Sequence, residues 1–333
     1  MMPDTPAAIV IGKLSREYLL PAVGDPRLDA PGGSLLYAAA GSKVWESSIG
    51  LVGRVGENYP HAWLREFESR GLDTKGIRIL AQSMDVRAFV AYSESFEATH
   101  INPVSHFARR GMTFPRSLLG YQPPDEKSAP APNFPTVGDI PPQYLDARAA
   151  HLCPMDLVTQ VQLIASLKRG TVNTFTLDPA PDTMTPAARR SLPALLQGVT
   201  AFLPSLEELH ALYWGETHNP WEMAEAIAVY GCETIVIKCG SRGQMVYESA
   251  SKKRWEVPVY PARIADPTGA GDAFCGGFLA GYRKDYDPLE GALYGNVSAS
   301  LKMEGGGPFY PLDVLPGLAQ ARLSMLRELV REV

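Results

Sequence analysis

The chain has 333 residues, with 36 acidic and 31 basic side chains and a formal net charge of −5. This balance excludes a broad basic surface for nucleic acid, and no apolar run approaches the ~18 residues of a membrane-spanning helix. The first cation after Asp4 is Lys13, the reverse of the order in a secretory signal. We therefore expect a cytoplasmic protein with no nucleic-acid partner and no membrane contact.

Short apolar runs alternate with helix-length segments along most of the chain. Strands are predicted over residues 8–12, 48–52, 86–92, 147–152, 172–177, 199–203, 234–238 and 244–247. Helices are predicted over residues 61–70, 157–169, 271–283, 288–303 and 312–330, and another begins near Ser205. This alternation indicates βαβ units. It predicts one α/β domain over residues 1–333, with a doubly wound, mostly parallel sheet and helices on both faces.

Residues 93–146 depart from this pattern because they contain nine prolines, seven of them in a Pro-rich excursion over residues 121–142. Proline removes a backbone donor and fixes φ, so neither regular helix nor regular sheet is expected here. Two interpretations of the excursion stay open. It is either an insertion without function, or a lid or partner surface.

The most informative stretch is residues 266–278, DPTGAGDAFCGGF. Pro267 ends the preceding extended segment, and Gly269 and Gly271 leave their amides uncovered. A helix begins here, so its first N–H groups and its positive dipole end favour an anion such as a phosphoryl group. Asp272 adds a carboxylate that can take a proton from a hydroxyl. A plain helix start with an acidic first turn is the alternative, but it does not require the whole string.

This string resembles the second signature of the PfkB/ribokinase family of carbohydrate kinases. Further matches are GGSLLYAA at residues 32–39, VGRVG at 52–56, GLDT at 71–74 and KCGSRG at 238–243. The resemblance covers nearly the whole chain. It implies a ribokinase-like fold with a small β lid built from residues 17–34 and 86–110.

The resemblance also implies an activity, which is ATP-dependent transfer of the γ-phosphoryl group to a hydroxyl of a small sugar, cyclitol or nucleoside. Asp272 would be the general base, and the amides of Gly269, Ala270 and Gly271 would form the anion hole. Asp266 and Thr268 would shape that loop and help to place phosphate or magnesium.

Other family positions carry implied binding roles. Gly32 and Gly33 would let the backbone approach the acceptor, and Lys238, Gly240 and Gly243 would line the ATP site. Asn296 would face the adenine, or else it is a solvent-facing or capping side chain. The implied cofactors are ATP and Mg²⁺, and the resemblance leaves a monovalent cation and a homodimer open.

Three departures from the family pattern concern the acceptor and the metal. The N-x-x-E motif is replaced by Ser205 to Glu208; Glu208 either keeps the magnesium role or only satisfies the helix dipole. Glu17 stands where the family has a sugar-binding aspartate, and Tyr37 replaces an asparagine. A phenol makes a different acceptor pocket from that of ribokinase. The G-G-x-x-x-Y pattern resembles a branch of the family that includes cyclitol and nucleoside kinases, so the resemblance favours these acceptors over ribose or fructose.

Other functions fit less well. Phe274 stands where a dinucleotide-binding fingerprint needs its third glycine, no P-loop is present, and the six histidines lack metal-ligand spacing. The four cysteines form no C-x-x-C pair and are predicted to be buried apolar residues. A non-catalytic nucleotide- or sugar-binding protein of the same fold remains the rival, although such a binder does not need a base at the phosphate site.

Overall fold

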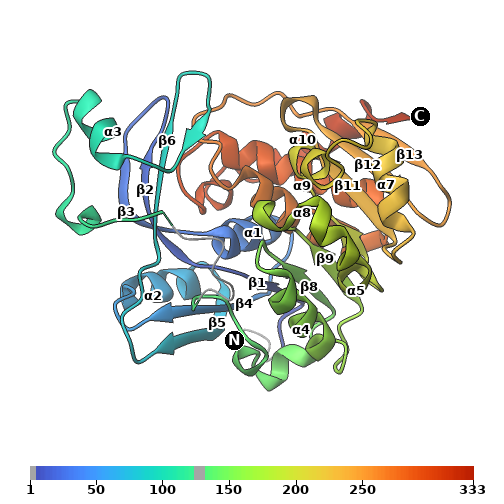
Figure 1. Ribbon diagram of the computed structural model, residues 1–333, viewed down its shortest axis with the longest axis horizontal. Coiled ribbons are helices and arrows are strands. Elements are labelled where there is room, and N and C mark those ends of the chain that lie inside the picture. The colour runs from blue at the N-terminus through green and yellow to red at the C-terminus, as the bar shows by residue number, and fades with distance from the viewer. Residues whose placement is uncertain (1–4, 124–131) are drawn as a thin grey trace.

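The structure, a computed structural model, describes residues 5–123 and 132–333. A ten-stranded sheet runs through its centre in the order β14-β13-β12-β11-β10-β9-β8-β1-β4-β5 (Figure 1). The strands are β1 Ala8–Ile11, β4 Ile49–Gly56, β5 Leu72–Leu80, β8 Ala149–Leu152, β9 Thr174–Leu177, β10 Ala201–Phe202, β11 Thr234–Lys238, β12 Gln244–Glu248, β13 Arg254–Val257 and β14 Arg331–Glu332. The pairs from β5 to β11 are parallel, and those from β11 to β14 are antiparallel.

Helices cover both faces of this sheet because alternate strand residues point to opposite sides. Ile9 and Ile11 pack in the core shared with α4 to α7, whereas Ala8 and Val10 pack in a core shared with α1 and α2. Helices α8 to α10 extend the second layer. Their bounds are α1 Ser34–Lys43, α2 His61–Ser69, α4 Leu157–Leu167, α5 Leu192–Leu196, α6 Leu206–Leu212, α7 Pro220–Ala228, α8 Ala270–Asp285, α9 Pro288–Met303 and α10 Leu318–Arg327. The predicted doubly wound α/β class is confirmed.

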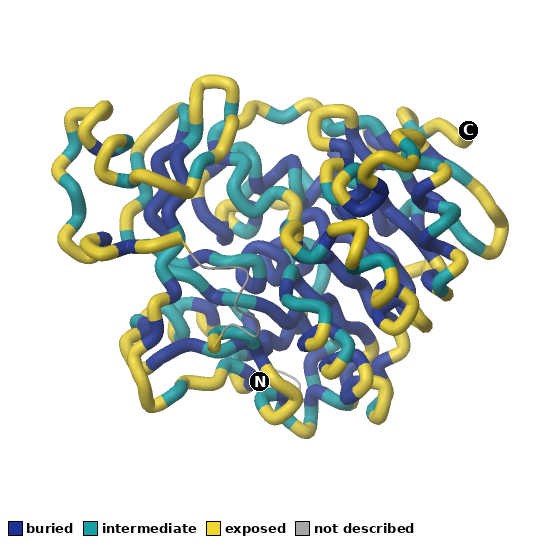
Figure 2. The backbone as a smooth tube through the Cα atoms, viewed as in Figure 1, coloured by how far each residue is buried: buried dark blue, intermediate teal, exposed yellow. Residues whose placement is uncertain are grey.

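A second, smaller sheet stands beside the main one, in the order β3-β2-β6-β7. Its strands are β2 Ser15–Leu20, β3 Arg27–Gly32, β6 Arg87–Tyr92 and β7 Ala98–Thr99. Figure 2 shows exposed loops around it, in contrast with the buried strands of the main sheet. These strands come from the two segments expected to form a lid, and their action as a lid stays a prediction.

Two details of the sequence prediction are wrong. Residues 93–146 are not free of regular structure, because they contain β7, α3 Pro103–Arg109 and short 3₁₀ turns. Pro103 is tolerated because it occupies the first turn of α3, where its missing N–H would be unpaired. The final helix begins at Leu318 rather than near residue 312, since Gly317 adopts φ +82° immediately before it. Residues 124–131 of the Pro-rich excursion lie outside the described residues.

Two further observations concern predictions of burial and of membrane contact. All four cysteines are buried and unpaired, as expected. Within the described part of the chain, no helix combines the length and apolarity needed to cross a bilayer.

Candidate active site

Residues 266–272, called the anion loop for its predicted role, comprise the turn before α8 and the first three residues of that helix. They include all four predicted catalytic residues. Gly269 is the N-cap of α8 and adopts φ +72°, a conformation that L side chains avoid. A Cβ at this position would also lie 2.1 Å from Cγ of Tyr37. Glycine is therefore required here both for its backbone conformation and for its close approach to the Tyr37 ring.

The free amides of this loop differ in one position from the prediction. The amide of Ala270 donates to the Pro267 carbonyl at 3.1 Å, so it belongs to a turn and not to the anion hole. Within the described residues, the amides of Gly269, Gly271 and Asp272 have no protein acceptor. Three backbone donors at the positive end of a 16-residue helix thus remain available for an anion.

Asp272 lies in the first turn of α8, beside these amides. Burial raises its pKa to about 7, and the nearby carboxylate of Asp178 acts in the same direction while Lys238 opposes it. A carboxyl group with a pKa near neutrality can accept a proton and release it again under physiological conditions. The geometry therefore combines an anion site with a proton acceptor.

Asp178 is a residue of this site that the sequence analysis missed. It follows β9, and its Oδ1 accepts a hydrogen bond from Nζ of Lys238, the last residue of β11, at 2.7 Å. The Cys275 thiol on α8 donates to its Oδ2 at 3.4 Å. An aspartate directly after a parallel strand was the available signal, because ligand sites gather at the carboxyl ends of such strands. Lys238 is thus paired within the protein next to Asp272.

Glu208 completes a capping box at the start of α6, and its magnesium role stays a prediction. Its Oε2 accepts the amide of Ser205 at 2.6 Å, and the Ser205 hydroxyl accepts the Glu208 amide at 3.2 Å, a complete capping box. Burial raises the pKa of Glu208, and the charge of Lys238 opposes this shift. Glu208 therefore caps α6, and this role uses only one of its two carboxylate oxygens.

Glu17 and Tyr37 are bonded to each other. The Tyr37 hydroxyl donates to Oε2 of Glu17 at 2.7 Å, and the Gly33 amide donates to Oε1 at 2.9 Å. A Cβ at Gly32 would lie 2.0 Å from the Glu17 carboxyl carbon. Tyr37 is only 2% exposed, so its hydroxyl is committed to Glu17 while its ring supports Gly269. The structure thus brings the predicted acceptor residues against the anion loop.

Asp266 and Thr268 connect the loop to its surroundings. Asp266 is buried, and its Oδ1 accepts the Thr268 amide at 2.9 Å. The Thr268 hydroxyl donates to the Tyr92 hydroxyl of β6 at 3.0 Å. Asp266 therefore shapes the loop from inside the protein, whereas Thr268 links the loop to the second sheet.

A small pocket of about 130 Å³ adjoins the loop. Its lining residues are Lys238, Gly240, Gln244, Val259, Ala270, Gly271, Phe274, Asn296, Ala299 and Met303. Asn296 is buried rather than solvent-facing or capping. It donates to Gln244 Oε1 at 2.7 Å and to the Pro258 carbonyl at 2.9 Å, and it accepts the Tyr260 amide. It therefore builds the pocket wall with all its polar atoms.

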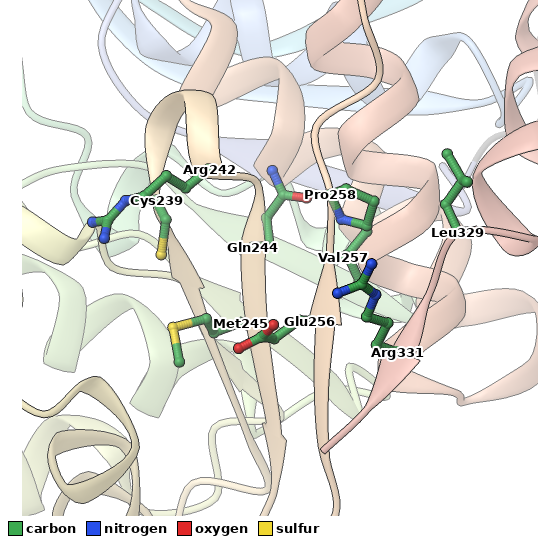
Figure 3. A pocket seen from close by; sticks show the side chains of 9 residues that line it. All are labelled: Cys239, Arg242, Gln244, Met245, Glu256, Val257, Pro258, Leu329 and Arg331. Carbon is green, nitrogen blue, oxygen red and sulfur yellow. The ribbon is translucent and has the colours of Figure 1, made fainter.

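Gly243 does not line this pocket. It adopts φ +88°, and a Cβ there would lie 2.0 Å from the Val257 carbonyl oxygen, so glycine is needed for strand packing. A larger pocket of about 520 Å³ lies along β12 and β13, with Arg242 at one side and Arg331 at the other (Figure 3). It shares only Gln244 with the small pocket and includes no residue of the 266–272 loop.

Comparison with solved structures identifies the fold. A putative ribokinase II from E. coli in complex with ATP and Mg²⁺ is 16% identical, with a TM-score of 0.69 over 97% of this chain and 99% of that one. A Burkholderia thailandensis nucleoside kinase in complex with inosine is 19% identical, with a TM-score of 0.68 over 96% and 98%. The fold is therefore that of the ribokinase-like α/β proteins.

The sequence comparisons identify the family. The pfkB family of carbohydrate kinases matches residues 116–314. A cytidine kinase from Thermococcus kodakarensis is 29% identical over 85% of this chain and 90% of its own length. The chain belongs to the pfkB family of carbohydrate kinases, and it is a phosphotransferase that acts on a hydroxyl acceptor.

Proposed function

We propose that this protein transfers the γ-phosphoryl group of ATP to a sugar hydroxyl of a nucleoside, with Asp272 as the general base. The observation that carries the proposal is the position of Asp272, a carboxyl with a pKa of about 7, beside three uncommitted amides. The similarity to a cytidine kinase over most of both chains supports a nucleoside.

In this mechanism the acceptor hydroxyl lies against Asp272 and loses its proton to the carboxylate as its oxygen attacks the γ-phosphorus. The bond between the γ-phosphorus and the bridging oxygen breaks, and ADP leaves with that oxygen. The amides of Gly269, Gly271 and Asp272 hold the transferring oxygens, where charge accumulates. The small pocket bounded by Asn296 would receive the adenine. The second sheet would exclude water, which limits hydrolysis of ATP.

Magnesium fits this site through Glu208. One Glu208 oxygen is committed to Ser205, and the other would hold the ion, directly or through water. Carboxylate oxygens and water are the ligands that Mg²⁺ prefers. When bound, the ion neutralises charge on the phosphates. Within the described part of the chain, no group of three or more His, Cys, Asp or Glu side chains is placed to hold a metal ion, so most of its ligands would be water and phosphate oxygens.

A non-catalytic binding protein of the same fold remains the second candidate, favoured by the replacement of the N-x-x-E asparagine with Ser205. It needs no group that titrates near neutrality at the anion site, so Asp272 argues against it.

The test is a mass-spectrometric screen. The protein is mixed with ATP and Mg²⁺ and offered nucleosides, cyclitols and sugars, with Asp272→Asn in parallel. We expect a nucleoside product one phosphoryl group heavier, and a turnover about 10²–10⁴-fold lower in the variant. Asp182→Asn, an exposed substitution, is the matched control. Near-normal turnover of Asp272→Asn would refute the base assignment, and phosphorylation of sugars alone would refute the acceptor class.

A further inference from the structure

A lysine is fully buried behind the anion loop. Lys302 lies in the last turn of α9 with 0% of its surface exposed. Its Nζ lies 3.0 Å from the Asp266 carbonyl oxygen, 3.0 Å from the Gly305 carbonyl oxygen and 3.2 Å from Asp266 Oδ2. A charged ammonium has three N–H donors, so this geometry uses every one of them.

These three oxygens belong to the two segments that support the site. Asp266 begins the 266–272 loop, and its Oδ1 fixes the Thr268 amide. Gly305 lies just beyond α9, and the nearby Gly307 amide also reaches Asp266 Oδ2 at 3.4 Å. The ammonium therefore joins the loop after α9 to the start of the anion loop.

The same charge also acts on the ring that supports Gly269. Nζ of Lys302 lies 5.5 Å from the centroid of the Tyr37 ring, within the range of a cation–π contact. Gly269 rests on that ring. Lys302 thus contacts Asp266, the first residue of the loop, and the Tyr37 ring that supports Gly269. It does not contact the three free amides of the loop.

Two carbonyls and a carboxylate around one positive charge are also the oxygen ligands that a bare alkali cation prefers. Here the ammonium fills that space, so these residues do not fit a bound monovalent cation. We propose that Lys302 is a built-in cation that holds the 266–272 loop in its anion-binding shape, and that phosphoryl transfer is therefore independent of K⁺ and Na⁺. This inference rests on the proposed function for its catalytic consequence only.

The test compares the wild type with Lys302→Ala, which opens the space between the three oxygens, and Lys302→Met, which fills it without charge. Turnover is measured in K⁺, NH₄⁺, Na⁺ and tetramethylammonium chloride at constant ionic strength. Wild-type turnover should vary less than about twofold. Lys302→Ala should lose about 10²-fold in tetramethylammonium and recover at least tenfold in K⁺ or NH₄⁺, whereas Lys302→Met should lose activity without recovery.

Thermal unfolding without nucleotide gives a readout that does not depend on catalysis. Relative to tetramethylammonium, K⁺ or NH₄⁺ should raise the Tm of Lys302→Ala by binding the folded state, but not that of the wild type or Lys302→Met. Lys43→Ala is the control, because Lys43 donates to the Ser47 carbonyl at the protein surface.

Three results would overturn the proposal: a tenfold loss of wild-type turnover without K⁺, a K⁺-dependent wild-type Tm, or full activity of Lys302→Met. If Lys302→Ala does not fold, the wild-type salt series and Lys302→Met still decide the question. If no acceptor is phosphorylated at all, the proposed function fails while the wild-type and variant Tm values still test the cation.

Discussion

The anion loop and the second sheet border the same site, but the protein holds them in different ways. The loop is fixed from beneath by buried groups, with Asp266 2% exposed and tied to Thr268 and Lys302. The second sheet has a small core of its own, formed by Tyr18, Leu20, Phe89, Ala91, Phe107, Leu118 and Tyr121. We therefore expect a preorganised phosphoryl end at the loop and a more adaptable acceptor end at the second sheet.

Apart from the loss of turnover expected for Asp272→Asn, the largest effect is expected at Gly269, where the loop meets Tyr37. Gly269→Ala should lower turnover by about 10²-fold or more, because the new Cβ would displace the Tyr37 ring and turn the amides away from the phosphoryl oxygens. Steady-state kinetics measure this loss. Gly120→Ala is the matched control, since Gly120 has φ +69° with nothing within 4 Å, and it should retain nearly full turnover. Equal losses in both variants would mean that backbone strain alone is responsible.

Next in size is the effect of Asp272 on stability. Because its folded pKa of about 7 lies above the ordinary 3.8, ionisation destabilises the folded state progressively as pH rises from about 4 to 7. Asp272→Asn should therefore raise the free energy of unfolding by about 1–3 kcal/mol at pH 8, after allowance for partial solvation, and by much less at pH 5. Denaturant unfolding at the two pH values measures this difference, with the exposed Asp25→Asn as control. A gain independent of pH would contradict the assignment.

A smaller effect is expected from Tyr37→Phe, which probes the link between the two regions. The change keeps the ring under Gly269 but removes the hydrogen bond to Glu17, and it should cost about 1 kcal/mol of stability. The KM for the acceptor should rise more than the KM for ATP. Tyr144→Phe removes a similar buried hydrogen bond, to the Asp73 carbonyl, and should change stability alone. An equal rise in both KM values would show that Tyr37 does not distinguish the two ends.

The smallest effect is expected from Tyr92→Phe, which removes the hydrogen bond between β6 and Thr268. We expect less than about a fivefold rise in the acceptor KM, corresponding to under 1 kcal/mol, and little change in turnover. Tyr121→Phe is the comparison, because Tyr121 packs in the core of the same sheet and its hydroxyl accepts the Phe89 amide. If Tyr92→Phe abolished turnover, the second sheet would belong to the preorganised part of the site together with the loop.

The sequence predicted the position of the 266–272 loop at the start of a helix because glycine and proline restrict the backbone locally. Asp266, Gly269, Gly271 and Asp272 lie together, and the Ala270 amide is used within the turn, while the catalytic roles of these residues stay predictions. Single residues brought in by tertiary packing were not predictable in this way. The place of Asp178 in the site depends on its contact with Lys238, which is distant in sequence. The sequence does not distinguish Lys302 from an ordinary helical lysine, because the fold brings its three acceptors to it.

The order of strands in the main sheet has a consequence for how the chain folds. From β8 to β13 each strand lies beside its immediate successor in sequence, so this half can assemble by local pairing. In contrast, β1 pairs with β8 through Ala8 and Ala149, about 140 positions apart. At synthesis rates of about 5–20 residues per second, β1 emerges on the order of 10 s before that partner. During this interval the edge of β1 that later pairs with β8 has no partner, so the N-terminal segment is exposed to misassembly.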